Sequence, residues 1–185
     1  MFGKLHKLFV GLMAIAVLVM TVNVAPAMAQ LKAGAAGNQN PPIAFNDWTQ
    51  VQSSNLGQIT KLTVHHGWLV DGIQATYNTT SLPAHGGMGG VSSEATFTAT
   101  DPLVEVSGYY GDFAYGNGLF ILQLTLKSKS GKVFGPFGTM QGSSNTKPFS
   151  YSTCDDQAVR AFWGGIDSGS GKYVTTLGIY ATRAS

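Results

Sequence analysis

The chain from Ile43 onward alternates short apolar runs with polar or glycine-containing breaks. The runs are rich in Val, Ile, Thr, Phe and Tyr, which favour β-strands, and Gly and Asn interrupt them as turn residues do. No stretch keeps an amphipathic helical period over three turns. The pattern predicts strands at Ile59–Val64, Trp68–Tyr77, Ala95–Ala99, Leu103–Tyr110, Phe120–Lys127, Lys132–Phe137, Phe149–Ser152, Val159–Trp163 and Tyr173–Ala181. Many short strands with regular turn signals indicate an all-β sandwich, barrel or prism.

Two N-terminal segments differ from this pattern. Residues 1–29 combine a basic start, a nearly unbroken apolar run and a small-residue ending, AMA, which is typical of a cleaved signal peptide. The apolar run is also close to the length of a membrane span, so a retained anchor is the alternative. Residues 30–42 are small, polar and proline-ended, which predicts a flexible leader. We therefore expect a secreted or periplasmic protein that starts at Gln30, is not inserted in the membrane after cleavage, and has one domain over residues 43–185.

Charge and cysteine content narrow the range of partners. Eleven Lys and Arg stand against nine Asp and Glu, and two of the lysines lie within residues 1–29, so the remaining chain is formally neutral. No basic stripe is left to neutralise phosphates, which argues against nucleic acid as a partner. Cys154 is the single cysteine and cannot form a disulfide within the chain. It either links two chains, which leaves a homo-oligomer open, or is a buried inert thiol.

The stretch from His65 to Gly90 carries the most distinctive polar pattern. Gly67 lies four residues before Asp71, and a glycine frees the backbone for a tight turn or a close approach to a ligand. A carboxylate at Asp71 accepts hydrogen bonds from two neighbouring hydroxyl groups, and the intervening backbone N–H groups donate to the same hydroxyls. The loop Gly86–Gly90 supplies a second backbone wall. The alternative is structural: Asp71 caps a hairpin turn and the glycines make a bend.

A second segment of the chain echoes this stretch. The sequence GWLVDGI at 67–73 resembles GKYVTTL at 171–177, since both begin with glycine, have valine three positions on and continue into an apolar strand. The separation is far too long for a solenoid repeat. The echo fits two pseudo-equivalent sheets of one closed domain, each opening with a turn of the same shape.

Several pieces of the sequence together resemble the jacalin-related lectins, over about residues 44–181. They are AFNDW at 44–48, LVDGIQATY at 69–77, HGGMGG at 85–90, VEVSGYYG at 104–111, LTLKSKSGKVFGPFG at 124–138 and TTLGIYA at 175–181. The resemblance implies an all-β fold, a β-prism of three four-stranded Greek-key sheets with pseudo-threefold symmetry, closed by both chain ends in the first sheet. It also implies carbohydrate binding with no catalysis and no cofactor, and glycans or glycoproteins with mannose- or galactose-type sugars as partners.

The resemblance places the family's main sugar site at Gly171, Lys172, Tyr173 and Thr175. An aspartate is expected where Thr175 stands, so this copy of the site is degenerate. Charge-assisted hydrogen bonds are roughly twice as strong as neutral ones, and we expect their loss to weaken sugar binding there. The opposing loop has Pro41-Pro42 where a glycine is expected. Asp167, in the longer loop before Gly171, is a candidate substitute for the missing carboxylate.

The resemblance places a second sugar site at Gly67, Trp68, Leu69, Asp71, Gly89 and Gly90. Here the Gly-x-x-x-Asp turn and its glycine loop match the family pattern without departure. Trp68 is the expected stacking aromatic, because it offers a flat apolar face beside polar donors. The alternative for Trp68 is an exposed tryptophan on an edge strand.

Two other classes of function compete with the lectin. A β-prism with a structural or adhesive role that has lost sugar binding is favoured by Thr175 and Pro42. A hydrolase or metal site is the weaker alternative, drawn from His65, His66 and His85. Adjacent histidines in a strand point to opposite faces, and no H-x-x-x-H, C-x-x-C or G-x-S-x-G element is present.

Overall fold

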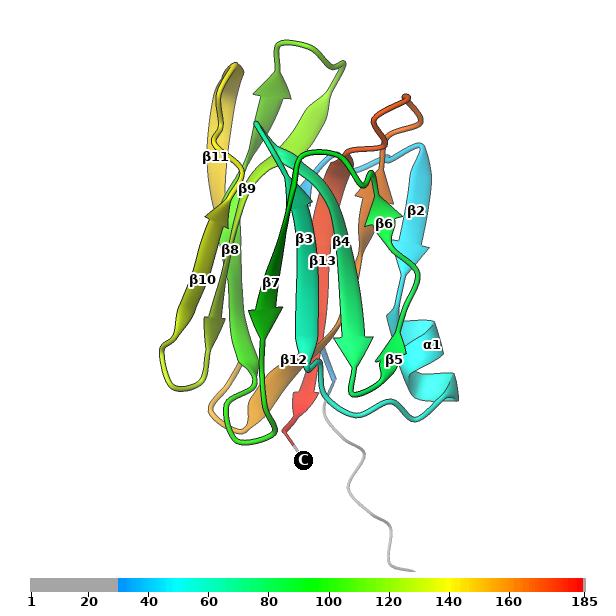
Figure 1. The fold of residues 1–185 in the computed structure, drawn as a ribbon, viewed down its shortest axis with the longest axis vertical. Coiled ribbons are helices and arrows are strands. Elements are labelled where there is room, and N and C mark those ends of the chain that lie inside the picture. The colour runs from blue at the N-terminus through cyan, green and yellow to red at the C-terminus, as the bar shows by residue number, and fades with distance from the viewer. Residues whose placement is uncertain (1–29, 185) are drawn as a thin grey trace, which may run out of the picture.

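The computed structural model describes residues 30–184, which form three antiparallel sheets and one short helix (Figure 1). The first sheet has the order β1-β13-β12-β2, with β1 at Leu31–Gly37, β2 at Ile43–Asn46, β12 at Gln157–Ile166 and β13 at Val174–Arg183. The second has the order β10-β9-β8-β11, with β8 at Leu103–Phe113, β9 at Leu119–Ser128, β10 at Val133–Phe137 and β11 at Ser143–Ser152. The helix, α1, covers Trp48–Ser53.

The third sheet has a divided edge. It contains β3 (Lys61–His66), β4 (Val70–Tyr77), β5 (Thr80–Ser81), β6 (His85–Gly86) and β7 (Val91–Thr96). The order is β5-β4-β3-β7, and β6 pairs with β4 further along the same edge as β5. The sheet therefore has four strand positions, and the three-sheet β-prism predicted from the sequence is confirmed.

The core lies between the sheets and receives side chains from all three. The central strands contribute fully buried residues two positions apart, namely Leu62 and Val64, Leu124 and Leu126, and Leu177 and Ile179. This spacing follows from the pleat, which turns alternate side chains to the same face of a strand. Burying each such side chain stabilises the fold by roughly 1.5–3 kcal/mol. The core thereby holds the three sheets in place, and the loops at their ends are free to vary.

Each sheet has a central hairpin, and all three hairpins turn at the same end of the molecule, opposite α1 (Figure 1). The second strand of each hairpin carries one extra residue shortly after the turn, a β-bulge. The extra residues are Asp71 in β4, Leu122 in β9 and Thr175 in β13. Each lies four positions after a glycine, at Gly67, Gly118 and Gly171 respectively. The twofold echo in the sequence is therefore part of a threefold structural repeat.

A glycine packs against the backbone of each bulge. These glycines are Gly86 beside Asp71, Gly138 beside Leu122 and Gly37 beside Thr175, and all three have positive φ. A Cβ at any of them would lie less than 3.0 Å from the carbonyl oxygen of the bulged residue. Only glycine combines this φ with so close an approach at no steric cost. The three turns therefore share one backbone plan, and their side chains set what each can bind.

The prediction of a flexible leader over residues 30–42 is wrong for Leu31–Gly37. This segment forms β1, an edge strand paired with β13. Its small residues let Trp163 pack over it, and Trp163 Nε1 donates a hydrogen bond to the Ala33 carbonyl at 3.1 Å. The Lys32 ammonium adds a cation–π contact 4.3 Å from the Trp163 ring centre. Backbone pairing needs no apolar alternation, which is why the pattern missed this strand.

Other expectations from the sequence are only partly confirmed. β2 lies in the same sheet as β13, as the resemblance implied, but the chain turns into α1 at Trp48. Six residues are too few to display a helical period. β4 begins at Val70, so Trp68 lies in the turn rather than in a strand.

Cys154 is exposed, so the interpretation as a buried thiol is wrong. The predicted signal peptide, residues 1–29, lies outside the described residues. Within residues 30–184, no helix has the length and apolar character to cross a membrane.

Candidate functional site

A cavity of about 270 Å³ opens at the end of the molecule where the hairpins turn. Its lining comprises Gly67, Trp68, Leu69, Asp71, Gly90, Phe113 and Tyr173. Five of these residues are the predicted turn and glycine-loop residues of the second site, so the fold brings them together. Gly89 adjoins them: a Cβ on it would lie 3.7 Å from Asp71 Oδ1.

The Asp71 carboxylate forms the polar wall of this cavity. The bulge in β4 turns its side chain toward the Gly89-Gly90 backbone, and a Cβ on Gly90 would lie 2.9 Å from Oδ2. Oδ2 is buried and has no hydrogen-bond partner among residues 30–184. Burial raises the pKa of Asp71 above its usual value of 3.8, although His66 and His65 oppose this rise. The Asp71 carboxylate therefore lines the cavity and has an acceptor that no described residue uses.

Two hydrogen bonds hold the His66 ring in place near the site. Its Nε2 lies 2.9 Å from Ser93 Oγ, and its Nδ1 accepts a hydrogen bond from the Gly138 backbone N–H at 3.3 Å. Because Nδ1 is the acceptor, the proton of the neutral ring is on Nε2 and is donated to Ser93. Burial lowers the pKa of His66, which Asp71 partly offsets. A neutral His66 leaves the Asp71 carboxylate without a strong ion-pair partner.

The turn itself offers backbone donors. The Gly67 N–H donates to the Leu69 carbonyl at 3.0 Å, and the Trp68 carbonyl accepts from the Met140 N–H at 3.1 Å. Within residues 30–184, the N–H groups of Trp68 and Leu69 donate to no carbonyl of a turn or loop and to no side chain. These two donors and the Asp71 acceptor together form a short array of the kind that vicinal hydroxyl groups need.

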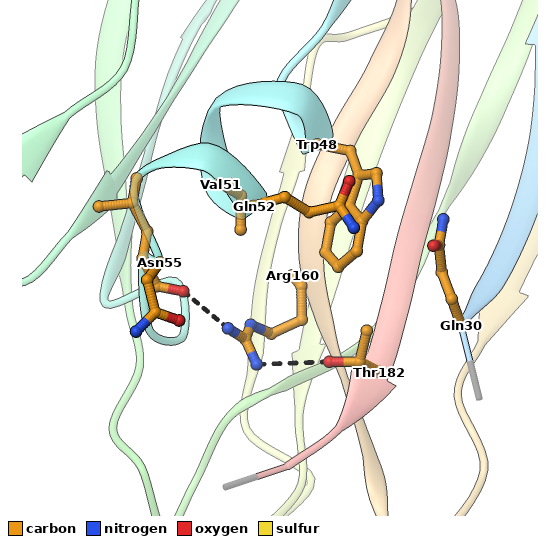
Figure 2. Close-up of a pocket in the computed structure, with 8 residues that line it drawn as sticks. Gln30, Trp48, Val51, Gln52, Asn55, Arg160 and Thr182 are labelled. Atoms are coloured by element: carbon orange, nitrogen blue, oxygen red, sulfur yellow. Dashed lines mark hydrogen bonds between the residues drawn. The ribbon is translucent and has the colours of Figure 1, made fainter. Parts of the chain in front are cut away.

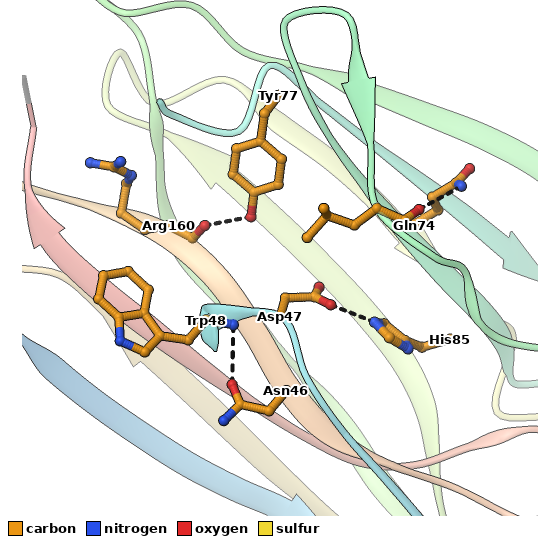
Figure 3. Close-up of polar contacts among 8 residues, drawn as sticks. Asn46, Asp47, Trp48, Gln74, Tyr77, His85 and Arg160 are labelled. Atoms are coloured by element: carbon orange, nitrogen blue, oxygen red, sulfur yellow. Dashed lines mark hydrogen bonds and ion pairs between the residues drawn. The ribbon is translucent and has the colours of Figure 1, made fainter. Parts of the chain in front are cut away.

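A hydrogen-bonding contact between His85 and Asp47 fixes the start of the glycine loop (Figure 3). His85 Nε2 lies 2.6 Å from Asp47 Oδ1, and the His85 ring stacks on Phe45 with ring centres 3.9 Å apart. Two residues on, the Gly87 N–H donates to the Asp71 carbonyl at 2.9 Å. His85 of β6 is thus tied to the β2–α1 corner, so it serves the loop and not a shared site with His65 and His66. Among residues 30–184 no three His, Cys, Asp or Glu side chains are grouped to hold a metal ion.

The degenerate turn, residues 171–175, differs from the turn at Asp71. Thr175 is only 3% exposed, and its Oγ1 is buried without a hydrogen-bond partner among the described residues. The Asn38 N–H donates to the Thr175 carbonyl at 2.9 Å, which holds the β1–β2 connection over the bulge. Pro41 packs on Gly165 in the same connection. Thr175 therefore faces the interior rather than solvent.

A separate cavity of about 430 Å³ lies beside that turn. It is lined by Pro42, Tyr115, Gly116, Asn117, Phe120, Asp167, Ser168, Gly169, Ser170, Gly171 and Tyr173. Neither Lys172 nor Thr175 lines it. Asp167 Oδ2 accepts from the Gly169 N–H at 3.1 Å, while Oδ1 is buried with no partner in the described chain. The structure thus brings Asp167, Gly171 and Tyr173 to one cavity and leaves Thr175 out.

Two aromatic residues that line these cavities, Phe113 and Tyr115, were not predicted from the sequence. Phe113 at the end of β8 lines the Asp71 cavity, and Tyr115 of the β8–β9 hairpin lines the other. Tyr173 lines both, although the resemblance assigned it to the degenerate site alone. Phe113 reads as an ordinary strand residue, and Tyr115 lies in a glycine-rich turn with no motif. Only the meeting of three hairpins at one end makes them neighbours.

The opposite end of the molecule holds a polar groove of about 410 Å³ beside α1 (Figure 2). Arg160 crosses it, with Nη2 donating to the Leu56 carbonyl at 2.7 Å and Nη1 to Thr182 Oγ1 at 3.3 Å. The Arg160 carbonyl in turn accepts from the Tyr77 hydroxyl (Figure 3). These contacts fasten the end of α1 to β12 and β13, so Arg160 has a structural role.

Comparison with known sequences identifies one family. The sequence model described as "Jacalin-like lectin domain" matches residues 35–180. Curated protein sequences yield no match.

Solved structures resemble the fold closely. An artocarpin–mannotriose complex matches with a TM-score of 0.66 and 19% sequence identity, over 82% of this chain and 97% of the other. A mannose-binding jacalin-related lectin from Ananas comosus gives 0.62 and 24%, over 84% and 98%. A mannose-specific jacalin-related lectin from Morus nigra, in complex with mannose, gives 0.64 and 23%, over 85% and 97%. At these identities the likeness shows the fold alone.

Proposed function

The chain belongs to the jacalin-like lectin domain family, and from that premise we propose that it binds neutral mannose- or galactose-type glycans without catalysis. The binding site in this proposal is the cavity around Asp71. The observation that carries it is the Asp71 carboxylate, which faces the Gly89-Gly90 backbone and keeps one oxygen unpaired among the described residues.

The chemistry of the cavity suits a pyranose sugar. Two vicinal hydroxyl groups donate to the Asp71 oxygens, and each accepts from a backbone N–H of Trp68 or Leu69. Hydrogen bonds to a charged group contribute roughly 1.5–3 kcal/mol each, so two of them supply most of the affinity of a small site. The exposed face of Trp68 covers the apolar C–H face of the ring. Few groups are engaged, and we expect millimolar to high-micromolar affinity for a monosaccharide.

Mannose is the first sugar to test, because the solved lectins from Ananas comosus and Morus nigra are described as mannose-binding or mannose-specific. Purified protein is passed over mannose-coupled and galactose-coupled resins and eluted with the free sugar. Retention on one resin with release by its sugar is the expected result. Passage through both resins at millimolar sugar densities would contradict the proposal.

A β-prism that has lost sugar binding is the second candidate function. The observation that favours it is the buried Thr175, which lacks the carboxylate expected at the family's main site. In that case neither resin retains the protein, and it has a structural or adhesive role.

We further propose export, with removal of residues 1–29. The support is the basic, apolar and small-residue order of that segment. N-terminal sequencing of protein recovered from the periplasm or medium is expected to begin at Gln30. A start at Met1 would contradict cleavage.

A further inference from the structure

The turn between β8 and β9 contains an asparagine followed by a glycine, Asn117-Gly118, at the hairpin end of the molecule (Figure 1). Asparagine is among the thermally labile residues of proteins. Its side-chain carbonyl carbon, Cγ, is open to attack by the backbone nitrogen of the next residue. Glycine hinders this attack least, because it has no Cβ. No other asparagine in the sequence precedes a glycine, so the turn differs chemically from the rest of the chain.

The structure leaves both reacting groups of this pair unengaged. Asn117 and Gly118 are exposed, and a Cβ built on Gly118 would meet no atom within 4 Å. Among residues 30–184, the Asn117 side-chain amide has no hydrogen-bond partner. The Gly118 N–H donates to no carbonyl of a turn or loop and to no side chain there. Neither packing nor a hydrogen bond therefore holds the Gly118 nitrogen away from Asn117 Cγ, and water reaches both.

Other asparagines of the described chain lack this combination. Asn145 Nδ2 donates to Asp112 Oδ2 at 2.7 Å, which ties down the side-chain amide. Asn78, in the β4–β5 turn, is exposed like Asn117, but Thr79 follows it. The branched Thr79 side chain restricts the backbone and crowds the approach of its nitrogen. Asn78 thus serves as an exposed asparagine with the same side chain and a hindered neighbour.

We propose that Asn117 is a site of spontaneous deamidation, with water as the only co-reactant. The Gly118 nitrogen loses its proton and forms a bond to Asn117 Cγ, and the Cγ–Nδ2 bond breaks as ammonia leaves with protons from solvent. Water then opens the succinimide ring. Opening at Cγ gives aspartate, and opening at the main-chain carbonyl carbon gives isoaspartate, in which the chain runs through the former side chain. Either product adds one negative charge to the turn.

The modified turn lies beside the candidate sugar site. Asn117 and Asp167 line the same cavity, and no lysine or arginine of the described residues lines it, so the new carboxylate faces a like charge. Tyr115 belongs to the same turn, and its ring centre lies 5.4 Å from that of Trp68 in the Asp71 cavity. Isoaspartate lengthens the backbone of the turn that carries Tyr115. Deamidation therefore changes both charge and backbone next to Trp68.

The test follows the modification directly and does not depend on the proposed function. The purified protein is incubated in mildly alkaline buffer, digested, and analysed by mass spectrometry and by enzymatic methylation of isoaspartate. Asn117 is expected to deamidate at a rate within about tenfold of that in a synthetic peptide of residues 112–122, because an unengaged turn needs no local unfolding to react. The rate is expected to rise with pH, since the Gly118 nitrogen must lose its proton. Asn78 in the same digest is the internal control and is expected to remain an amide.

Two variants identify the site. Asn117→Gln keeps a side-chain amide, but its extra methylene disfavours ring closure, and the isoaspartate signal is expected to disappear. Asn117→Asp carries the charge of the product and is expected to elute from an ion exchanger with the modified wild-type protein. Deamidation of Asn117 more than about tenfold slower than in the peptide overturns the inference. An undiminished isoaspartate signal in Asn117→Gln overturns it as well, and both results leave the proposed sugar binding standing.

Discussion

The turns at Asp71 and Thr175 share a backbone and differ in chemistry. Both follow a glycine by four residues, both hold the extra residue of a bulge, and both are approached by a glycine of positive φ. Yet Asp71 lines an open cavity, whereas Thr175 is covered by the β1–β2 connection. The third copy, at Leu122, shows the extreme case, because its side chain is fully buried among apolar residues.

This comparison separates the geometry of a site from its function. A bulge re-aims the side chain that it carries, but the residue type and the loop above it decide whether that side chain meets a ligand. Asp71 and Gly90 of the glycine loop line one cavity, and the proline-containing connection at Pro41-Pro42 accompanies a closed turn. Substitutions at Asp71 and Thr175 test whether the two turns can be made to exchange properties.

The largest effect is expected from placing a carboxylate in the closed turn. Thr175→Asp places a charge at a buried side chain whose Oγ1 has no hydrogen-bond partner among residues 30–184, and we expect it to lower the free energy of unfolding by about 3 kcal/mol. It is not expected to create a sugar site. Chemical denaturation measures the stability and calorimetry the binding. A stable Thr175→Asp protein with a second sugar equivalent would show that the two turns are interchangeable.

Removing the charge from the open turn is expected to affect binding instead. Asp71→Asn keeps the shape of the side chain but replaces a charged acceptor with a donor, and we expect monosaccharide affinity to fall by about tenfold or more. The fold is expected to persist, since Asp71 pairs with no cation within 4 Å among the described residues. Unchanged affinity in a folded Asp71→Asn protein would rule out Asp71 as the main acceptor.

Sugar binding at Asp71 is expected to depend on pH. Burial raises the pKa of Asp71 above 3.8, and only the ionised carboxylate accepts from both sugar hydroxyls. Affinity is therefore complete well above the raised pKa and falls by about tenfold per pH unit below it.

The effect of Asp71 on stability has the opposite sign. Since its folded-state pKa exceeds its unfolded value, ionised Asp71 lowers the stability of the free protein. Relative to Asp71→Asn, the stability of the wild type is thus expected to rise as pH falls through the raised pKa toward 3.8. Titrations and melts of both proteins across this range check the two signs, and parallel pH profiles would refute them.

The smallest effect is expected from removing the Thr175 hydroxyl. Oγ1 is buried with no partner among the described residues, so Thr175→Val removes an unsatisfied polar atom and is expected to stabilise the fold by about 1 kcal/mol. Monosaccharide affinity is expected to change by less than about threefold. Thermal melting and calorimetry measure the two quantities. Loss of binding in Thr175→Val would make the closed turn the working site.

Much of the fold could be predicted from the sequence because it depends on local patterns. Alternating apolar residues define strands such as those around Leu124 and Ile179, whose buried faces hold the sheets together. The Gly67–Asp71 turn and its glycine loop could also be predicted. The backbone conformation of the turn, the bulge and the position of the carboxylate all depend on residues close in sequence. The strand at Leu31–Gly37 was not, because edge pairing uses backbone groups that every sequence has.

Short-range periodicity and turn chemistry thus predicted an all-β fold and the residues of the open turn, whereas the division into three sheets was predicted from the family resemblance. The folded structure was needed to show that Thr175 is covered, that Tyr173 lines two cavities and that Tyr115 contacts Trp68. These facts depend on how three hairpins converge at one end of the prism. The reason is physical: exposure and contact between distant side chains follow from the packing of whole sheets, which no local window of sequence contains.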